Sequence, residues 1–366
     1  MKIPFFDYRR QYKKIKPEID MAIKRVLNSG KLILAEEVRN FENNFSNYTG
    51  TKYGIGVNSG TDALKIALRA LDIKQGDEII TVSNTAVPTV SAIREAGAKP
   101  VFVDIKDDYT INEKLIEKNV TEKTKAIVPV HLYGQLCNLQ VILKIAKKYK
   151  LKVIEDCCQA HGAKINGQSV GTFGDFGCFS FYPTKNLGAY GDGGMILTSD
   201  KNLAEKCQAL RMYGMKNGYY SKMEGYNSRL DEIQAAILNV KLKYLDRWLA
   251  QRRQIAKFYL NNIKNPHLIL PPISNLDNHS FHLFVIRTTQ RTKLINYLSK
   301  NGIGYGIHYP RPIHLQNAYK FLGYKKKSLP TTEKFCNQVV SLPIFPELTS
   351  KELKFITNKI NQWLKK

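Results

Sequence analysis

The chain has 366 residues, of which 43% are hydrophobic and 10% aromatic, and it carries a formal net charge of +25. This length suits one large domain plus a smaller one, and the composition is that of a globular protein that buries a real core. No stretch of eighteen apolar residues occurs, and the start, MKIPFFDYRRQYKK, lacks a secretory pattern, so we expect neither a transmembrane helix nor a signal peptide.

The positive charge admits nucleic acid, an anionic membrane or a phosphate-bearing small molecule as a partner. The lysines are spread along the chain, without one long basic block or an RNA-binding aromatic motif. This distribution favours a generally solvated surface over a nucleic-acid patch, so we expect neither nucleic acid nor a membrane as partner.

The six cysteines contain no C-x-x-C pair, and Cys157 and Cys158 are adjacent. Such spacing suits neither zinc nor an ordinary disulfide, so we expect reduced thiols and a cytoplasmic location. The histidines show no metal-ligand spacing, and no metal is predicted.

Strand and helix patterns alternate through much of the chain. A helix is expected over residues 13–27, and helical spacing recurs in TDALKIALRAL and NLQVILKIAKKYK. Buried strands are expected at DEIITV, KPVFVDI, KAIVPVHLYG, LKVIEDC and GGMILTSD. The alternation predicts an α/β fold with a mostly parallel sheet covered by helices.

The character of the chain changes after residue 229. One long helical region is predicted over 229–263, followed by a strand at HSFHLFVIR, a helix at TKLINYLSKNG and a strand at IGYGIHYP. We therefore predict a large domain over residues 1–249 and a smaller α+β domain over residues 250–366.

The stretch VNSGTDALKIAL is the first of three fragments that carry chemistry. Asn58, Ser59, Gly60 and Thr61 precede a periodic helix, whose N-terminus offers free amide N–H groups to an anion. Gly60 permits a close approach. An ordinary capped helix, with Ser59 or Thr61 as the cap, is the alternative.

The second fragment is VIEDCCQAHG, in which Asp156 ends a buried strand. Ligands of open α/β sheets gather at the carboxyl ends of strands, where a carboxylate can hold a heterocyclic nitrogen protonated. Gln159 and His161 follow within reach of the same crevice. Alternatively, Asp156 is a turn residue and His161 a structural histidine.

The third fragment, CFSFYPTKNLGAYGDGG, places Ser180 and Lys185 on either side of Tyr182 and Pro183. A lysine held among aromatic side chains loses hydration, which favours its neutral, nucleophilic form. An anion cradle, a carboxylate and a desolvated amine are together what pyridoxal phosphate needs. Its phosphate anchors the ring, its protonated ring nitrogen withdraws electrons and its aldehyde joins a lysine.

These fragments, with GYNSRLDEIQAA downstream, resemble the DegT/DnrJ/EryC1/StrS family of sugar aminotransferases. The resemblance covers essentially the whole chain, from FFDYRRQY to HYPRPIHLQNAY. It implies the fold-type I architecture of pyridoxal 5'-phosphate enzymes, in which a mostly parallel mixed sheet is followed by a smaller C-terminal domain. It also implies a homodimer whose active sites lie at the subunit interface.

The resemblance assigns a role to each matching residue. Lys185 would join the cofactor, Asp156 would pair with the pyridine nitrogen, and Gln159 would lie near the hydroxyl side of the ring. The phosphate would be held by Ser180, Gly60 and Thr61, with Asn227 reaching it from the other subunit. Related dehydratases carry histidine in place of this lysine, so Lys185 favours amino transfer.

One departure from the family lies in SNTAVPT. Relatives often carry an aromatic residue after the threonine that matches Thr85, and that residue stacks on the cofactor ring. Here Ala86 stands at this position. We therefore expect Thr85 near the ring and assign no stacking aromatic.

The resemblance implies that L-glutamate donates the amino group and that a nucleotide-linked keto sugar accepts it. HYPRPIHLQNAY and NTAVPT resemble members that aminate C-3 of dTDP-linked 3-keto-6-deoxyhexoses, which would give a dTDP-3-amino-3,6-dideoxyhexose. The candidate sugar contacts are Tyr182, Lys216, Tyr219, Tyr220, His308 and Tyr309, with His314 nearby. For each of them, ordinary packing is the alternative.

Two other functions stay open. One is a 4-aminotransferase acting on a UDP- or GDP-linked 4-keto-6-deoxy sugar, which would have the same cofactor site. The other is a non-catalytic regulator or nucleic-acid-binding protein, against which Lys185, Asp156 and Ser180 argue.

Overall fold

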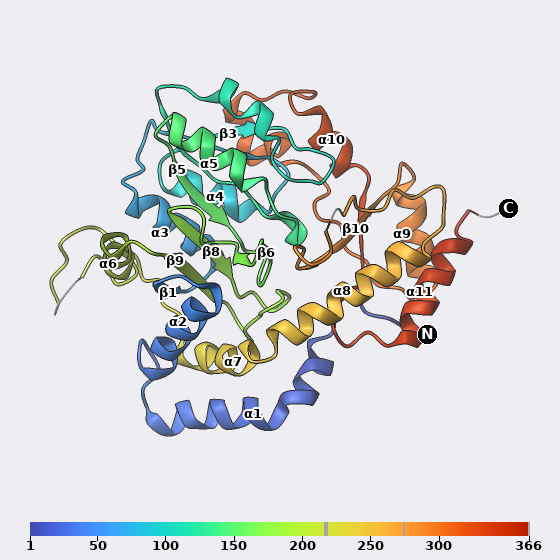
Figure 1. Ribbon diagram of the computed structural model, residues 1–366, viewed down its shortest axis with the longest axis horizontal. Coiled ribbons are helices and arrows are strands. Elements are labelled where there is room, and N and C mark those ends of the chain that lie inside the picture. The colour runs from blue at the N-terminus through green and yellow to red at the C-terminus, as the bar shows by residue number, and fades with distance from the viewer. Residues whose placement is uncertain (216–218, 274, 365–366) are drawn as a thin grey trace.

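The computed structural model describes residues 1–215, 219–273 and 275–364, and a seven-stranded mixed sheet forms its centre (Figure 1). Across the sheet, the strands are β1 (Tyr53–Val57), β9 (Gly194–Thr198), β8 (Phe176–Ser180), β5 (Lys152–Asp156), β4 (Thr124–Ile127), β2 (Glu78–Val82) and β3 (Lys99–Val103). Neighbours from β8 to β3 are parallel, whereas β9 runs antiparallel to both β8 and β1. The predicted α/β fold with a mostly parallel sheet is confirmed.

Helices cover both faces of this sheet, and the sequence of β8 shows why. Phe176 and Cys178 pack into the cluster under α3 (Gly60–Ala70) and α6 (Lys201–Leu210), whereas Phe179 packs with α2 (Glu36–Thr49) on the opposite face. Side chains alternate between faces along a strand, so a nearly continuous apolar run fits a sheet buried on both sides. The covering layers also contain α4 (Val87–Glu95), α5 (Leu139–Lys148) and α7 (Glu232–Leu242).

A smaller C-terminal layer is built on an antiparallel pair of strands. Strand β10 (Phe284–Arg287) pairs with β11 (Val339–Leu342), beside α8 (Leu245–Asn262), α9 (Arg291–Lys300) and α11 (Ser350–Gln362). The N-terminal Ile3 is buried in the same cluster, before α1 (Tyr8–Ser29) packs along α7 (Figure 1). Shorter elements are the hairpin of β6 (Lys164–Ile165) and β7 (Gln168–Ser169) and the helix α10 (Pro330–Cys336). Short 3₁₀ helices are η1 (Glu113–Leu115), η2 (Glu117–Asn119), η3 (Leu132–Gly134), η4 (Ile313–Leu315) and η5 (Asn317–Leu322).

The predicted domain boundary at residues 249 and 250 falls inside α8. Leu249 packs toward the large sheet, whereas Tyr259 packs against Phe284 of β10, with ring centroids 5.0 Å apart. The helix therefore carries the chain from one core to the other, and the boundary stays a prediction.

One predicted strand is wrong, and one predicted helical region consists of two helices. The helical region expected over 229–263 is interrupted between α7 and α8, where the chain turns from the large sheet toward the C-terminal layer (Figure 1). IGYGIHYP forms only isolated bridges, of Ile303 with Ile3 and of Gly306 with Ser341. The N-terminal segment packs directly against the backbone of this stretch: a Cβ on Gly304 would lie 2.4 Å from the amide nitrogen of Phe5. Strand β10 instead pairs with β11, a strand that was not predicted from the sequence.

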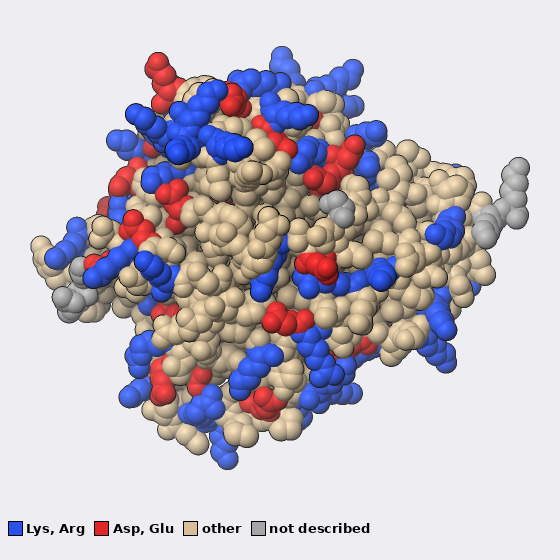
Figure 2. All heavy atoms as spheres, in the orientation of Figure 1, with Lys and Arg blue, Asp and Glu red and all other residues tan. Residues whose placement is uncertain are grey.

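The surface carries its positive charge in a dispersed form. Figure 2 shows Lys and Arg scattered over one face, most of them toward its upper and lower edges, with Asp and Glu among them and other residues between. In the described part of the chain, no helix is long and apolar enough to cross a membrane.

Candidate active site

A cavity of about 250 Å³ opens where β5 and β8 end, beside the N-terminus of α3. Eight of the residues selected from the sequence line it: Gly60, Thr61, Thr85, Asp156, Gln159, Ser180, Tyr182 and Lys185. The other lining residues are Ser59, Leu64, Ala86, Pro88, Thr89, Val130, Cys158 and Asp192. The cavity thus lies at the edge of the sheet where open α/β folds bind small molecules.

Lys185 lies on the tight turn that follows β8. Its amide N–H donates to the carbonyl oxygen of Tyr182 across 2.9 Å, which closes the turn. Burial lowers the pKa of the Lys185 amine, and the charges of Cys158 and Asp156 oppose this shift. The lowered pKa increases the neutral fraction of the amine at physiological pH. Lys185 is in this way more nucleophilic than a lysine whose amine is solvated.

Asp156 presents a carboxylate that accepts a hydrogen bond on each oxygen. The amide N–H of Cys158 donates to Oδ1 across 3.1 Å, and the hydroxyl of Thr89 donates to Oδ2 across 2.8 Å. The hydroxyls of Thr85 and Thr89 lie 2.9 Å apart. Because Thr89 has one hydrogen and donates it to Asp156, Thr85 is the donor to Thr89. These bonds fix the orientation of the carboxylate and leave lone pairs free for a further donor.

The N-terminus of α3 forms the opposite wall. Ser59 caps the helix, its hydroxyl oxygen accepting from the amide of Asp62 across 3.1 Å. The amides of Gly60 and Thr61 stand in the first turn, where helical N–H groups have no intrahelical acceptor. A Cβ on Gly60 would lie 2.6 Å from the Cβ of Ser180, so glycine allows β8 to end against the helix. Amides and the Ser180 hydroxyl together make a cradle suited to an anion.

Gln159 links this cavity to the C-terminal layer. Its Oε1 accepts from the amide of Tyr133 across 2.8 Å, and its Nε2 donates to the hydroxyl of Tyr309 across 3.0 Å. The hydroxyl of Tyr133 in turn donates to the carbonyl oxygen of His308. The two candidate sugar contacts, His308 and Tyr309, are thus held beside the cavity although they do not line it.

Several other selected residues lie away from the cavity. The side chains of Tyr219 and Tyr220 are exposed, and so is that of Asn227. Lys216 lies outside the described residues. His161 is fully buried against Phe179, with ring centroids 5.3 Å apart, and burial lowers its pKa to about 3. Of the two interpretations of His161, the structural one is therefore favoured.

Tyr182 and His314 are two further candidates from the sequence, and they lie in different surroundings. Tyr182 is 53% exposed at the mouth of the cavity, where it can meet a ligand. The ring of His314 is buried between Ser83 and Glu333, with nitrogen–oxygen distances of 2.8 and 3.2 Å, and does not line the cavity.

Thr89 was not among the predicted site residues, although it contacts Asp156 directly. Pro88 occupies the first turn of α4, a position that proline favours because its N–H is not needed there. Pro88 predicts a helix that begins near residue 87, which places Thr89 in the first turn, close to the chain that enters the helix at Thr85. That signal could have identified Thr89.

The family of this chain follows from comparison with known proteins. A model of the DegT/DnrJ/EryC1/StrS aminotransferase family matches residues 13–361. The chain belongs to this aminotransferase family. A dTDP-3-amino-3,6-dideoxy-alpha-D-galactopyranose transaminase of Aneurinibacillus thermoaerophilus is 48% identical over 362 residues, 99% of each chain. A pleiotropic regulatory protein of Geobacillus stearothermophilus is 46% identical over 368 residues, again 99% of each.

The fold of the chain also matches a solved structure of this family over its full length. S. venezuelae DesV, in complex with a ketimine intermediate, has a TM-score of 0.97 and 40% sequence identity, covering 100% of this chain and 99% of DesV. The fold-type I aminotransferase architecture expected from the sequence is confirmed.

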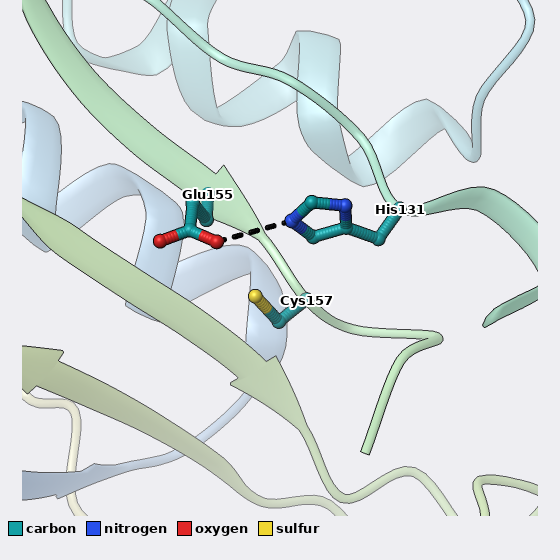
Figure 3. A group of neighbouring side chains, drawn as sticks. All are labelled: His131, Glu155 and Cys157. Carbon is teal, nitrogen blue, oxygen red and sulfur yellow. Dashed lines mark hydrogen bonds and ion pairs between the residues drawn. The ribbon is translucent and has the colours of Figure 1, made fainter. Parts of the chain in front are cut away.

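A second polar cluster supports the site of this aminotransferase from behind β5. Glu155 precedes Asp156 in β5, so their side chains point to opposite faces of the sheet. Figure 3 shows Glu155 pointing toward His131, whose Nε2 lies 3.2 Å from Oε2, with Cys157 beside them. Ligand atoms of these three buried residues lie within 4.8 Å of one another, a spacing that a metal site would share.

The hydrogen bonds of this cluster favour a scaffold over a metal site. The Glu155 carboxylate accepts three amide N–H groups, from Gly171 and Phe173 across 2.8 Å and from Gly174 across 2.9 Å. The Nδ1 of His131 accepts the amide N–H of Cys137 across 3.2 Å, which places the ring proton on Nε2. The lone pairs of Glu155 and His131 that a metal would need are engaged, and the cluster instead holds the loop 171–174 against β5.

Proposed function

We propose that this protein transfers the amino group of L-glutamate to a dTDP-linked 3-keto-6-deoxyhexose, giving a dTDP-3-amino-3,6-dideoxyhexose, with pyridoxal 5'-phosphate as its cofactor. One observation carries the proposal: a single cavity joins the amine of Lys185, the oriented carboxylate of Asp156 and the anion cradle of α3. The choice of sugar is supported by the name of the Aneurinibacillus relative.

The residues of the cavity fit the chemical groups of this cofactor. The α3 amides and the Ser180 hydroxyl suit its phosphate. Asp156 has acceptor capacity left for a ring N–H, and Gln159 stands next to it on the cavity wall. When bound, pyridoxal phosphate supplies an electron-withdrawing ring that stabilises negative charge at the carbon beside the transferred nitrogen.

Lys185 supplies the proton transfers. With the cofactor held in the cavity, its neutral amine would take a proton from the α-carbon of glutamate, and it would return a proton to the product in the sugar half-reaction. The lowered pKa of Lys185 matches this role, because a general base must be largely unprotonated at the working pH. Asp156 keeps its orientation through both halves, since Thr89 and the Cys158 amide hold its two oxygens.

The sugar is proposed to meet Tyr182, His308 and Tyr309 at the mouth of the cavity. Asn227, Tyr219 and Tyr220 are exposed and do not line the cavity of their own chain. We propose that they, with Lys216, serve the active site of a second copy in a homodimer. The proposed location is the cytoplasm, where sugar nucleotides and glutamate occur together.

The test is an incubation of purified protein with pyridoxal phosphate, glutamate and either a 3-keto or a 4-keto dTDP-6-deoxyhexose. The proposal predicts 2-oxoglutarate release and an amino group at C-3, located by NMR of the product. Amination of the 4-keto compound alone would contradict the regiochemistry and favour the alternative, a 4-aminotransferase tested with UDP- and GDP-linked sugars.

A regulatory role is the second candidate, because one relative of 46% identity is named a pleiotropic regulatory protein. The dispersed basic surface is compatible with a weak, salt-sensitive attraction to nucleic acid. A mobility-shift assay at low and at physiological salt tests it. Sequence-specific retention that persists at physiological salt, without transaminase activity, would favour the regulator.

A further inference from the structure

A second cavity, of about 230 Å³, adjoins the first, and Tyr182 lines both. It lies between the N-terminal segment, the Lys185 turn and the C-terminal layer. Its walls are Phe5, Phe6, Tyr182, Thr184, Arg252, His282, Leu283, His308 and Ile344. Among the residues that the structure describes, the lining therefore contains one permanent cation, Arg252, and no acidic side chain.

Arg252, on α8, is 2% exposed and forms no ion pair with a carboxylate in the described ranges. Its Nη1 donates to three carbonyl oxygens, of Phe281, His282 and Ile344, across 3.1, 3.4 and 2.8 Å. Its Nε has no hydrogen-bond partner among the described residues. The edge of the guanidinium that holds Nε and Nη2 is the edge that binds a carboxylate with two parallel bonds.

His282 adds a second unpartnered group. It is 8% exposed, and its Nδ1 has no hydrogen-bond partner among the described residues. Burial, together with the charge of Lys185, lowers the pKa of His282 well below its usual range and that of His308 to about 4. Both rings are therefore neutral at pH 7, and the permanent charge of the cavity is that of Arg252. Burial lowers the pKa of Arg252 to about 10, and the charge of the buried Glu347 opposes this shift, so Arg252 is still positive at pH 7. Glu347 does not line the cavity and forms no hydrogen bond with Arg252 among the described residues, so the free edge of the guanidinium has no direct partner.

A buried cation with an unsatisfied N–H is costly unless an anion compensates it. The apolar walls of Phe5, Phe6, Leu283 and Ile344 suit a short methylene chain beside that anion. A volume of about 230 Å³ gives room for a small acid. The Lys185 turn forms one wall, through Thr184.

From this geometry we infer that the second cavity is the carboxylate subsite for the amino donor, in which Arg252 and His282 bind a carboxylate of glutamate. Tyr182 lines both cavities, and the charge of Lys185 acts on His282 and His308 in the second one, so a carboxylate bound here would lie near the reacting centre. This inference rests on the proposed function and names residues for its first half-reaction.

The direct test uses glutarate, a five-carbon dicarboxylate that lacks an amine and cannot react. Its binding to the protein without cofactor is measured by calorimetry, beside the neutral analogue glutaramide. We expect glutarate to bind and glutaramide to bind at least tenfold more weakly, because a hydrogen bond to a charged group contributes about 1.5–3 kcal/mol. Equal affinities for the two compounds would overturn the inference.

Variants distinguish the subsite from a structural role. Arg252→Gln and His282→Ala should each weaken glutarate binding, by roughly tenfold or more for the arginine. Arg253→Gln is the matched control, since its Nε bonds the carbonyl oxygen of His279 and it does not line the cavity. If Arg252→Gln fails to fold because three carbonyls lose their donor, His282→Ala still decides the matter. Unchanged glutarate affinity in His282→Ala would contradict the subsite.

Kinetics separate this inference from the proposed function. In the folded variants, the KM for glutamate should rise while the KM for the keto sugar stays within about twofold. A rise confined to the sugar KM would assign the cavity to the sugar and overturn the inference. Absence of amino transfer by the wild-type protein would contradict the proposed function, whereas the glutarate measurement would still report on the subsite.

Discussion

The hydroxyl of Thr89 lies 2.8 Å from Oδ2 of Asp156 and donates its hydrogen bond to that carboxylate. Thr85 donates to Thr89 from 2.9 Å, so a short relay runs from α4 to the end of β5. The carboxylate that faces the cavity is thus oriented by residues some seventy positions earlier in the chain.

Replacing Thr89 by valine preserves the side-chain shape and removes this donor. We expect kcat to fall roughly 10- to 100-fold, because a hydrogen bond to a carboxylate contributes about 1.5–3 kcal/mol. Thr89→Ser should restore most of the rate, since it returns the hydroxyl. Steady-state kinetics at saturating cofactor test this, and a Thr89→Val enzyme with wild-type kcat would contradict the role given to Thr89.

The close approach of β8 to α3 is expected to require a glycine at position 60. Its added Cβ would lie 2.6 Å from the Cβ of Ser180. Glycine to alanine within a helix usually stabilises by up to ~1 kcal/mol, whereas overpacking costs about 1–3 kcal/mol. We expect Gly60→Ala to lower the free energy of unfolding, and to lower it less in a Ser180→Gly background. Equal costs in both backgrounds, measured by urea denaturation, would count against the contact.

The buried amine of Lys241 is expected to make the free energy of unfolding depend on pH. This amine donates to the carbonyl oxygen of Gly188, in the turn after Lys185, and burial lowers its pKa to about 7. The folded pKa lies below the unfolded value, so between the two the unfolded chain binds more protons and stability rises with pH. From pH 7 to pH 9 this contributes about 2 kcal/mol.

The matched variant for this test is Lys241→Met. The increase in unfolding free energy between pH 7 and pH 9 should be smaller in Lys241→Met than in the wild type, by about 2 kcal/mol. Both proteins are measured without cofactor, so that linked binding does not enter. Parallel pH profiles would show that Lys241 does not titrate in this window.

Glu155 is expected to be structurally essential although it lies outside the cavity. The partners of the Glu155 carboxylate are all N–H donors: three backbone amides of the loop 171–174 and the ring of His131. Glu155→Gln replaces one acceptor oxygen by an NH₂ group, so that donors then face donors. We expect a loss of about 3 kcal/mol in unfolding free energy. Glu117→Gln is the control, because its ion pair with Lys148 is exposed and should contribute less than ~1 kcal/mol. Similar losses in the two variants would contradict the scaffold.

The sequence predicted the centre of the site because its residues lie in three short fragments next to recognisable elements. Lys185 follows an apolar strand, Gly60 opens a periodic helix and Asp156 ends a buried strand, and parallel strands bring such ends together. Arg252 and His282 could not be found in this way. Arg252 stands in an ordinary helical pattern, and only the folding of α8 against the segment before β10 places it at a cavity.

The errors in the predicted elements have a related cause. IGYGIHYP has the composition of a strand, but it forms only two single bridges, one of Ile303 with Ile3 of the N-terminal segment and one of Gly306 with Ser341 of β11. The first of these contacts spans some three hundred residues. No local pattern announces a partner at that distance. The interruption between α7 and α8 likewise depends on the two different surfaces that these helices cover.

The central claim is that the Lys185 amine joins pyridoxal phosphate and carries out the first half of amino transfer. The most direct measurement is the absorbance spectrum of wild type and Lys185→Ala with pyridoxal phosphate, before and after glutamate is added. The account predicts a band of the lysine-bound cofactor in the wild type, which glutamate removes as 2-oxoglutarate appears, and no such band in the variant. A wild-type protein that shows no such band, or a Lys185→Ala variant that retains it together with wild-type turnover, would contradict the account.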